Sequence, residues 1–229
     1  MRTVNKRGSL SSKAGRTRGF TTVEVLIVML IVLIVAAMAI PGYSAMARYF
    51  RIAGDIRDMN GMVAQAKMRA AQDFTHARVH ADLSANSLSL EVWDGSANSG
   101  AGCWKTDGDS VNRCTASASP VQRLSAGVAF GFASASAGAP NPQSTIGQAP
   151  ACTSGVAGGT AGSTLSNTAC IEFNSRGLPV AASGSPTAND ALYITDSSSV
   201  YGVTVIVSGL IQIWTANPGN GGTTVWAAR

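Results

Sequence analysis

The chain contains few of the residues that build large cores, charged surfaces or reaction centres. Aromatic residues make up 6% of its 229 residues, charged residues 13%, and there are two histidines. The sparse aromatics predict a modest core. His76 and His80 lack the glutamate of the His-Glu-x-x-His metalloprotease motif, and no serine lies in a nucleophile motif. We therefore expect no catalytic residues, and a membrane-anchored enzyme is the least favoured class.

The C-terminal part of the chain lacks a cationic surface. From Val79 to Arg229, five basic residues stand against eight acidic ones. The net charge of +5 comes instead from Met1–Gly19, which holds six basic and no acidic residues and leaves a net charge of −1 for the remainder. We therefore expect no nucleic-acid partner. The six basic residues are Arg2, Lys6, Arg7, Lys13, Arg16 and Arg18.

Charge is nearly absent from the segment that follows. Phe20 to Ile40 is an apolar run of 21 residues with a single charge, on Glu24. As a helix, this run is long enough to cross roughly 30 Å of hydrocarbon. Basic residues just before an apolar span stay on the cytoplasmic side, so the rest of the chain is sent outward. The sequence predicts a single-pass membrane protein.

Glu24 needs a partner if it lies in a membrane. An unpaired carboxylate there costs at least a few kcal/mol, and the span contains no basic residue. Cleavage after Gly19 would create a basic partner for Glu24, because the new α-amine of Phe20 would lie one helical turn away. An ordinary secretory signal has its cleavage site after the apolar region, whereas the suitable site here precedes it. The alternative is a signal anchor whose Glu24 is accidental, which the cost of the unpaired acid disfavours.

The basic leader, Gly19, Phe20, Glu24 and the immediate apolar helix together resemble the class III signal of type IV pilins and type II secretion pseudopilins. The resemblance implies that a prepilin peptidase removes residues 1–19 and that Phe20 is N-methylated. It also implies that Glu24 and the Phe20 amine of neighbouring subunits pair during filament assembly. The protein would be anchored in the cell inner membrane, with its C-terminal domain in the periplasm.

The helical pattern resumes beyond Pro41-Gly42, so we expect the helix to bend there and continue. The resemblance to pilins also implies a kink at Pro41. The sequence predicts a long N-terminal helix over residues 20–76, with its transmembrane part at 20–40 and its regular pattern reaching about Phe74. Gly54 and Gly61 weaken it by up to roughly 1 kcal/mol each, so packing against the domain must support it. One apolar stripe follows the helix, formed by Tyr49, Ile52, Ile56, Met59, Val63, Ala66 and Ala70.

Residues 77–229 are expected to form a β-rich periplasmic domain, because the apolar period changes to two after the helix. Leu88, Leu90 and Val92 should face inward. The predicted fold is α+β and type IV pilin-like, with the long helix packed on a largely antiparallel sheet. Residues 133–168 are almost wholly small or polar and are predicted to form a long loop, which either meets a partner or has no role. Strands are predicted at 77–83, 87–94, 124–132, 169–174, 191–196, 203–207 and 210–215.

All four cysteines lie on the predicted outer side of the membrane, where disulfides persist. Of the three pairings, we favour Cys103–Cys114 and Cys152–Cys170, because each pair brackets a polar loop that contains glycine. Closing each loop would contribute on the order of 3 kcal/mol. Zinc is the alternative, but no Cys-x-x-Cys spacing occurs and both histidines are far away in sequence, so we expect no metal and no cofactor.

Two further motifs bear on ligand binding. Asp107, Asp109 and Asn112 form an oxygen cluster that suggests either a calcium site or, as we favour, a solvated turn. Pilins that capture DNA carry a Gly-Arg-x-Arg sequence in the last hairpin, and the matching stretch here begins at Gly209 and reads Gly-Leu-Ile-Gln. Both arginines are absent, which disfavours DNA reception.

The element order resembles the branch that joins the H-type pseudopilin of type II secretion with the T-type fimbrial minor pilin. We therefore expect a minor pseudopilin of a type II secretion system or type IV pilus, assembled into a periplasmic filament for protein secretion. The alternative is a surface minor pilin in adhesion, motility or DNA uptake. The expected partners are a prepilin peptidase, other pseudopilins or pilins, and the inner membrane.

Overall fold

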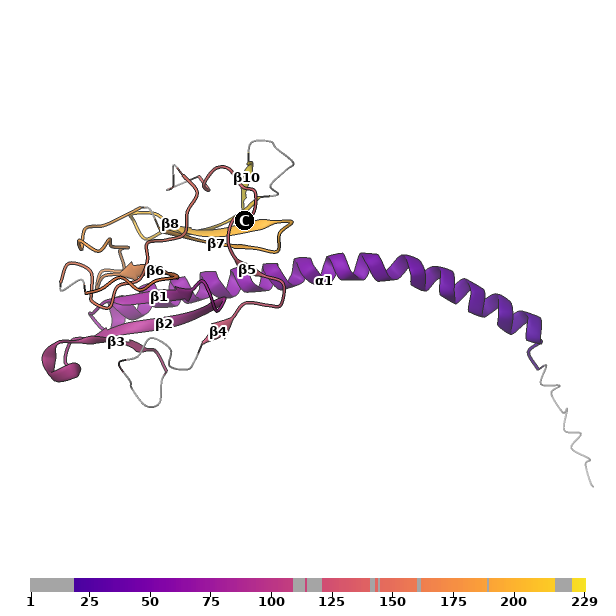
Figure 1. Cartoon of the computed structure of the whole chain (residues 1–229), viewed down its shortest axis with the longest axis horizontal. Helices are drawn as coiled ribbons and strands as arrows, with labels where there is room; N and C mark the ends of the chain where they lie inside the picture. Colours follow the sequence, from indigo (N-terminus) through magenta and orange to yellow (C-terminus); the bar gives the residue numbers. More distant parts are fainter. Residues whose placement is uncertain are drawn as a thin grey trace, which may run out of the picture. The chain divides into compact units, whose positions relative to one another are not determined.

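The structure is a computed structural model that describes residues 19–108, 114, 121–140, 143, 145–159, 162–188, 190–216 and 224–229. The side chains of residues 41, 42, 44 and 45 are outside this description. The chain divides into two compact units, Met1–Ala45 and Met46–Arg229. Its elements are one long helix and antiparallel sheets, which is the predicted α+β class (Figure 1).

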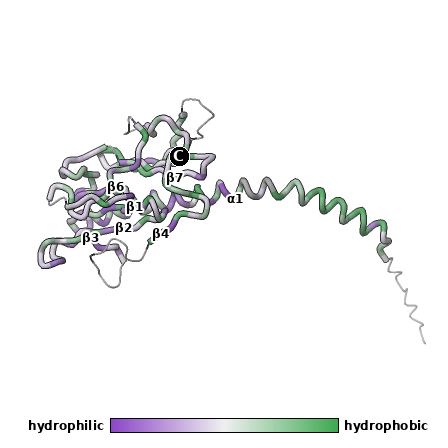
Figure 2. The backbone as a smooth tube through the Cα atoms, viewed as in Figure 1, coloured by the Kyte–Doolittle hydropathy of each residue, from purple (hydrophilic) through white to green (hydrophobic). Residues whose placement is uncertain are grey.

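The first unit contains the start of helix α1, Thr22–Gln72. Its stretch Thr22–Ile40 is long and apolar enough to cross a membrane, and none of it is buried. Figure 2 shows apolar residues continuing along this part of α1. The helix is continuous through residues 41 and 42, as predicted, while the kink at Pro41 stays a prediction.

The helix ends at Gln72, a few residues before the predicted boundary. Phe74 has a φ of 50°, a left-handed conformation that an α-helix cannot continue through. The N–H of Thr75 then donates to the carbonyl oxygen of Ala70, so the last turn is closed by a bond that spans five residues. The chain leaves this turn directly into the first strand.

The second part of α1 supplies one face of the main core. The predicted stripe is confirmed from Ile52 onward, whereas Tyr49 is 45% exposed. Tyr49 instead lines a groove of about 280 Å³ together with Tyr201 and Arg229. Burying each larger aliphatic side chain contributes roughly 1.5–3 kcal/mol, which offsets the weak helix propensity of Gly54 and Gly61. The buried members of the stripe are Ile52, Ile56, Met59, Val63, Ala66 and Ala70.

Two antiparallel sheets pack in the second unit, where one sheet was predicted. We call them sheet A and sheet B. Sheet A has the order β3-β2-β1-β6, and β4 also pairs with β2. Sheet B has the order β10-β9-β8-β7-β5. The strands of sheet A are β1 (Ala77–Asp82), β2 (Ser87–Asp94), β3 (Cys103–Thr106), β4 (Gln122–Arg123) and β6 (Thr168–Phe173). Those of sheet B are β5 (Ala129–Phe130), β7 (Asp190–Thr195), β8 (Val200–Val205), β9 (Ile211–Ala216) and β10 (Trp226–Ala228). A short 3₁₀ helix, η1 (Asn98–Gly100), precedes β3.

Most predicted strands are present, with shifts of one to three residues at several ends. The prediction of a single strand over residues 124–132 is wrong, because that segment holds only the short strand β5 and follows β4. Ser125, Ala126 and Gly127 turn between them, and Gly127 has a φ of 85° that interrupts extended backbone. β3 and β10 were not predicted, since neither short segment shows a regular alternation.

A connecting segment, residues 122–130, links the two sheets and is fixed to α1. We call it the strap. Asp55 accepts hydrogen bonds from both the N–H and the hydroxyl of Ser125, each at 2.9 Å. Arg51 donates to the carbonyl oxygen of Ala126 at 2.9 Å. The strap begins in sheet A with β4 and ends in sheet B with β5, so polar contacts join α1 to both sheets.

Candidate functional sites at the N-terminal helix and beneath the second disulfide

Gly19 and Phe20 precede α1 and are exposed, with Phe20 at 81%. The N–H of Glu24 donates to the Thr21 hydroxyl oxygen at 3.2 Å, which caps the start of the helix. A capping box would also use the Glu24 carboxylate, but no bond from it back to Thr21 occurs among the described residues. Glu24 itself is exposed in the first turn of α1. Its carboxylate thus remains available for a partner outside the described part of the chain.

Both predicted disulfides are present. Cys103 is bonded to Cys114, with their Cα atoms 5.5 Å apart, and Cys152 to Cys170, with theirs 4.9 Å apart. In the loop that the first disulfide closes, residues 109–113 lie outside the described residues. The second joins strand β6 to the long predicted loop, and it therefore fixes where that loop lies against sheet A.

The described part of the predicted loop over residues 133–168 contains no long strand, and its residues 152–157 cover part of sheet A. Three backbone groups, on alternate residues of this segment, make hydrogen bonds to side chains of that sheet. Arg78 donates to the carbonyl oxygen of Thr153 at 2.6 Å, and Trp104 donates to that of Gly155 at 2.8 Å. The N–H of Ala157 donates to Glu172 at 2.9 Å. We call residues 152–157 the cover. Of the two alternatives given for this loop, a surface for a partner or no role, neither anticipated that the cover packs on the protein's own sheet A.

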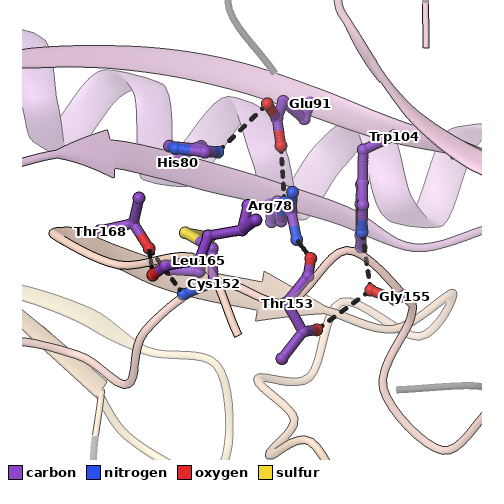
Figure 3. Close-up of a disulfide and its surroundings, with 10 residues drawn as sticks. Arg78, His80, Glu91, Trp104, Cys152, Thr153, Gly155, Leu165 and Thr168 are labelled. Atoms are coloured by element: carbon purple, nitrogen blue, oxygen red, sulfur yellow. Dashed lines mark hydrogen bonds and ion pairs between the residues drawn. A yellow bond between two sulfur atoms is a disulfide. The ribbon is translucent and has the colours of Figure 1, made fainter. Parts of the chain in front are cut away.

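A buried ion pair lies beneath the cover (Figure 3). Arg78 of β1 and Glu91 of β2 are cross-strand neighbours, and the Arg78 Nε donates to Glu91 Oε2 at 2.6 Å. Both side chains are 1% exposed. The guanidinium also lies 4.0 Å from the centre of the Trp104 ring, a cation–π contact. A pair so enclosed is inaccessible to a substrate, and its partners specify the packing of the cover onto the sheet.

The environment keeps this pair ionised. Burial lowers the pKa of Arg78, while Glu91 and Glu172 oppose that effect. Burial would raise the pKa of the Glu91 carboxyl, but the neighbouring His80 and Arg78 outweigh it and lower that pKa below its ordinary value. The pair is therefore stabilised by the attraction between its opposite charges and by the hydrogen bond from Arg78 to the cover.

Glu172 of β6 adds to the polar side chains beneath the cover. We call Arg78, His80, Glu91 and Glu172 the polar layer. The Oε1 of Glu172 lies 2.9 Å from Nδ1 of His76 and accepts a hydrogen bond from the N–H of Ala157.

Asp190, at the start of β7, is buried, and its Oδ2 has no hydrogen-bond partner among the described residues. Burial, followed by the charge of Glu172, raises the pKa of Asp190 to about 7. In the folded state, the protonated form of Asp190 therefore predominates below about pH 7.

His80 lies beside the second disulfide, contrary to the sequence argument that separated the histidines from the cysteines. His80 and Cys170 are register partners across β1 and β6. A ring nitrogen of His80 and the sulfur atoms of Cys152 and Cys170 all lie within 4.8 Å of one another. The strand pairing brings together residues that are 90 positions apart in the chain, which no spacing rule detects.

The other two candidate ligand sites have structural partners. Arg69 donates to both carboxylate oxygens of Asp107, at 2.9 and 2.6 Å, so Asp107 is already engaged by a cation. Asp109 and Asn112 lie outside the described residues, and the calcium alternative therefore stays untested. In the stretch from Gly209 to Gln212, Gly209 accepts a hydrogen bond from Lys67 and Leu210 is exposed.

Comparison of the chain with known protein families, with curated proteins and with solved structures gave no match. The features above thus stand on the residues of this chain alone. Within the described residues, they are one candidate membrane helix and an antiparallel domain with two disulfides.

Proposed function

We propose that the protein is a minor pseudopilin or minor pilin, which is processed after Gly19 and assembles through its N-terminal helix into a periplasmic filament. The observation that carries this proposal is the position of Glu24. It is the single charge in an exposed apolar segment, and its carboxylate is not used by the helix cap. Such a group in a membrane is a functional residue that needs a partner.

Processing would supply that partner. Removal of residues 1–19 creates a charged amine on Phe20, which is four residues before Glu24. Within the low dielectric of a filament, the charge-assisted bond between this amine and a neighbour's Glu24 is strong. In this proposal the domain acts mechanically and not as a catalyst, because it is carried on the same continuous helix that supplies the filament contact.

The secretion-type filament is favoured over DNA uptake. Gly209 is followed by Leu210, Ile211 and Gln212, so the last hairpin has no arginines at the positions that contact phosphate in DNA-capturing pilins. The net negative charge of residues 79–229 also opposes binding to a polyanion.

The test uses the full chain expressed in a host that has a prepilin peptidase. N-terminal sequencing of the membrane-extracted protein should begin at Phe20, with an added N-methyl group. Glu24→Gln should still be inserted and cleaved but should fail to crosslink to partner subunits, while the control Thr22→Ser should behave as wild type. An intact Met1, or a cut beyond Ile40, contradicts the processing step. Normal crosslinking of Glu24→Gln contradicts the ion pair.

A further inference from the structure

The described residues contain one group of three potential metal ligands close together, formed by His80, Cys152 and Cys170. In the oxidised protein the two sulfurs are bonded to each other. Thiolates, not disulfides, bind metals, so this group becomes a ligand set only after reduction. Its position beneath the cover then determines what it can bind.

The spacing suits a zinc ion. Zinc bonds of about 2.3 Å to sulfur and about 2.0 Å to nitrogen place tetrahedral ligand atoms roughly 3.5–3.8 Å apart. The three atoms here already lie within 4.8 Å of one another. Two of the ligands are held by paired strands, because His80 and Cys170 face each other across β1 and β6. Only small side-chain rotations are required once the two sulfurs separate.

The surroundings of His80 also fit a metal ligand. Its Nδ1 lies 3.2 Å from Glu91 Oε1, and both atoms are buried. Histidines that bind zinc usually direct their second nitrogen toward a carboxylate, which fixes the ring. Glu91 can therefore accept from Nδ1–H and leave Nε2 for the metal.

We propose that His80, Cys152 and Cys170 form a zinc site when the Cys152–Cys170 disulfide is reduced. A dithiol or phosphine reductant supplies two electrons, the S–S bond breaks, and each sulfur takes up one proton. Zn²⁺ then displaces both thiol protons and binds two thiolates and one neutral imidazole. These ligands balance the charge of the ion inside a buried site, and the fourth position is filled by water.

Zinc binding would couple to the redox state of the cover. Because zinc binds only the reduced form, each tenfold rise in zinc concentration above its dissociation constant shifts the reduction equilibrium tenfold, or about 30 mV. The cover stays attached to sheet A in both states, through a disulfide in one and through a shared metal in the other.

The test uses the full chain in detergent with the first disulfide removed by Cys103→Ser and Cys114→Ser. After anaerobic reduction with a phosphine, Co²⁺ is titrated as a spectroscopic probe. We expect one equivalent to give thiolate-to-cobalt charge-transfer absorption and tetrahedral ligand-field bands, which Zn²⁺ abolishes. The oxidised protein should give neither signal. His80→Asn should weaken binding at least about tenfold. The matched control, His76→Asn, should not, because His76 faces Glu172 instead.

Near-UV circular dichroism separates loss of the site from loss of folding. If the reduced chain loses its tertiary signal, zinc should restore it in the wild type and fail to do so in His80→Asn. Zinc should also slow alkylation of Cys152 and Cys170 in the wild type. The proposal is overturned if cobalt gives no charge-transfer band, or if His80→Asn binds as tightly as His76→Asn.

Discussion

Lys67 Nζ donates a 2.8 Å hydrogen bond to the carbonyl oxygen of Gly209, which joins the last turns of α1 to the turn between β8 and β9. Gly209 has a φ of 76°, and a Cβ at this position would lie 2.7 Å from the carbonyl oxygen of Gly177. The glycine is thus required by both backbone conformation and close packing.

Gly209→Ala should therefore destabilise the domain by about 1–3 kcal/mol. Gly61→Ala is the matched change, because a Cβ at Gly61 meets nothing within 4 Å. It should stabilise the domain by up to about 1 kcal/mol through better helix propensity. Urea unfolding followed by tryptophan fluorescence measures both, since all four tryptophans lie between residues 93 and 226. If both substitutions changed the free energy of unfolding in the same direction, the specific requirement for glycine at position 209 would be contradicted.

The Arg78–Glu91 pair should show a large coupling energy. Glu91→Gln leaves a buried guanidinium without its counter-charge and should cost about 3–5 kcal/mol. The double variant Arg78→Met with Glu91→Leu should cost clearly less than the sum of its two single changes. Some loss will remain, because the Thr153 carbonyl oxygen loses its donor.

The more exposed pair of Arg69 and Asp107 is the control for this double-mutant cycle. Its side chains are 34% and 18% exposed, so solvent screens the charges and the coupling should stay below about 1 kcal/mol. Denaturant unfolding of each set of four proteins gives the two coupling energies. Similar values for the two pairs would show that burial does not strengthen the Arg78–Glu91 interaction.

Asp190 should make the domain less stable as pH rises. Its pKa is raised from 3.8 to about 7 in the folded state, so the folded state binds the proton more tightly than the unfolded chain. The stabilisation by this proton is complete below about pH 4 and is lost as pH rises to about 7. Between about pH 5 and pH 8, the wild type should lose roughly 2–3 kcal/mol that Asp190→Asn does not lose.

The measurement compares the free energies of unfolding of the two proteins at each pH. The other ionisable groups are the same in both proteins, so their effects largely cancel in the difference. Parallel pH profiles for wild type and Asp190→Asn would exclude this role for Asp190.

Removing the two disulfides should have different local effects. In the oxidised protein, Cys152→Ser with Cys170→Ser should cost about 3 kcal/mol and should also increase solvent exposure of Trp104, because the cover loses its attachment next to Gly155. Cys103→Ser with Cys114→Ser should leave hydrogen exchange of the Ala157 N–H unchanged. Hydrogen exchange that reports equal loosening at Ala157 in both variants would contradict a specific role of the second disulfide.

Regular periodicity made parts of the fold predictable from sequence. The apolar stripe predicted along the helix is confirmed from Ile52 to Ala70, where one face of α1 is buried, and it fails at Tyr49, which is exposed. The strand Ser87–Asp94 was predicted with its observed ends, because Leu88 and Leu90 alternate with polar residues. The disulfide pairings followed from loops that are short enough to close locally.

The polar layer could not be predicted in the same way. Alternation places Arg78, His80 and Glu91 on the face opposite the core, and such a face is normally assigned to solvent. The residues that bury it belong to the cover, which is about 75 positions further along the chain. Its small and polar composition gives no periodic signal, so only the tertiary fold shows that this face is enclosed.

The strap also determines how a mechanical load would spread through the domain. Residues 122–126 are held by hydrogen bonds to three side chains that together span about two helical turns of α1, namely Arg51, Asp55 and Asp58. Since the strap enters sheet A at one end and sheet B at the other, tension along α1 is delivered to both sheets at once. Shear between the helix and either sheet must therefore break several polar contacts together before the apolar core can slide.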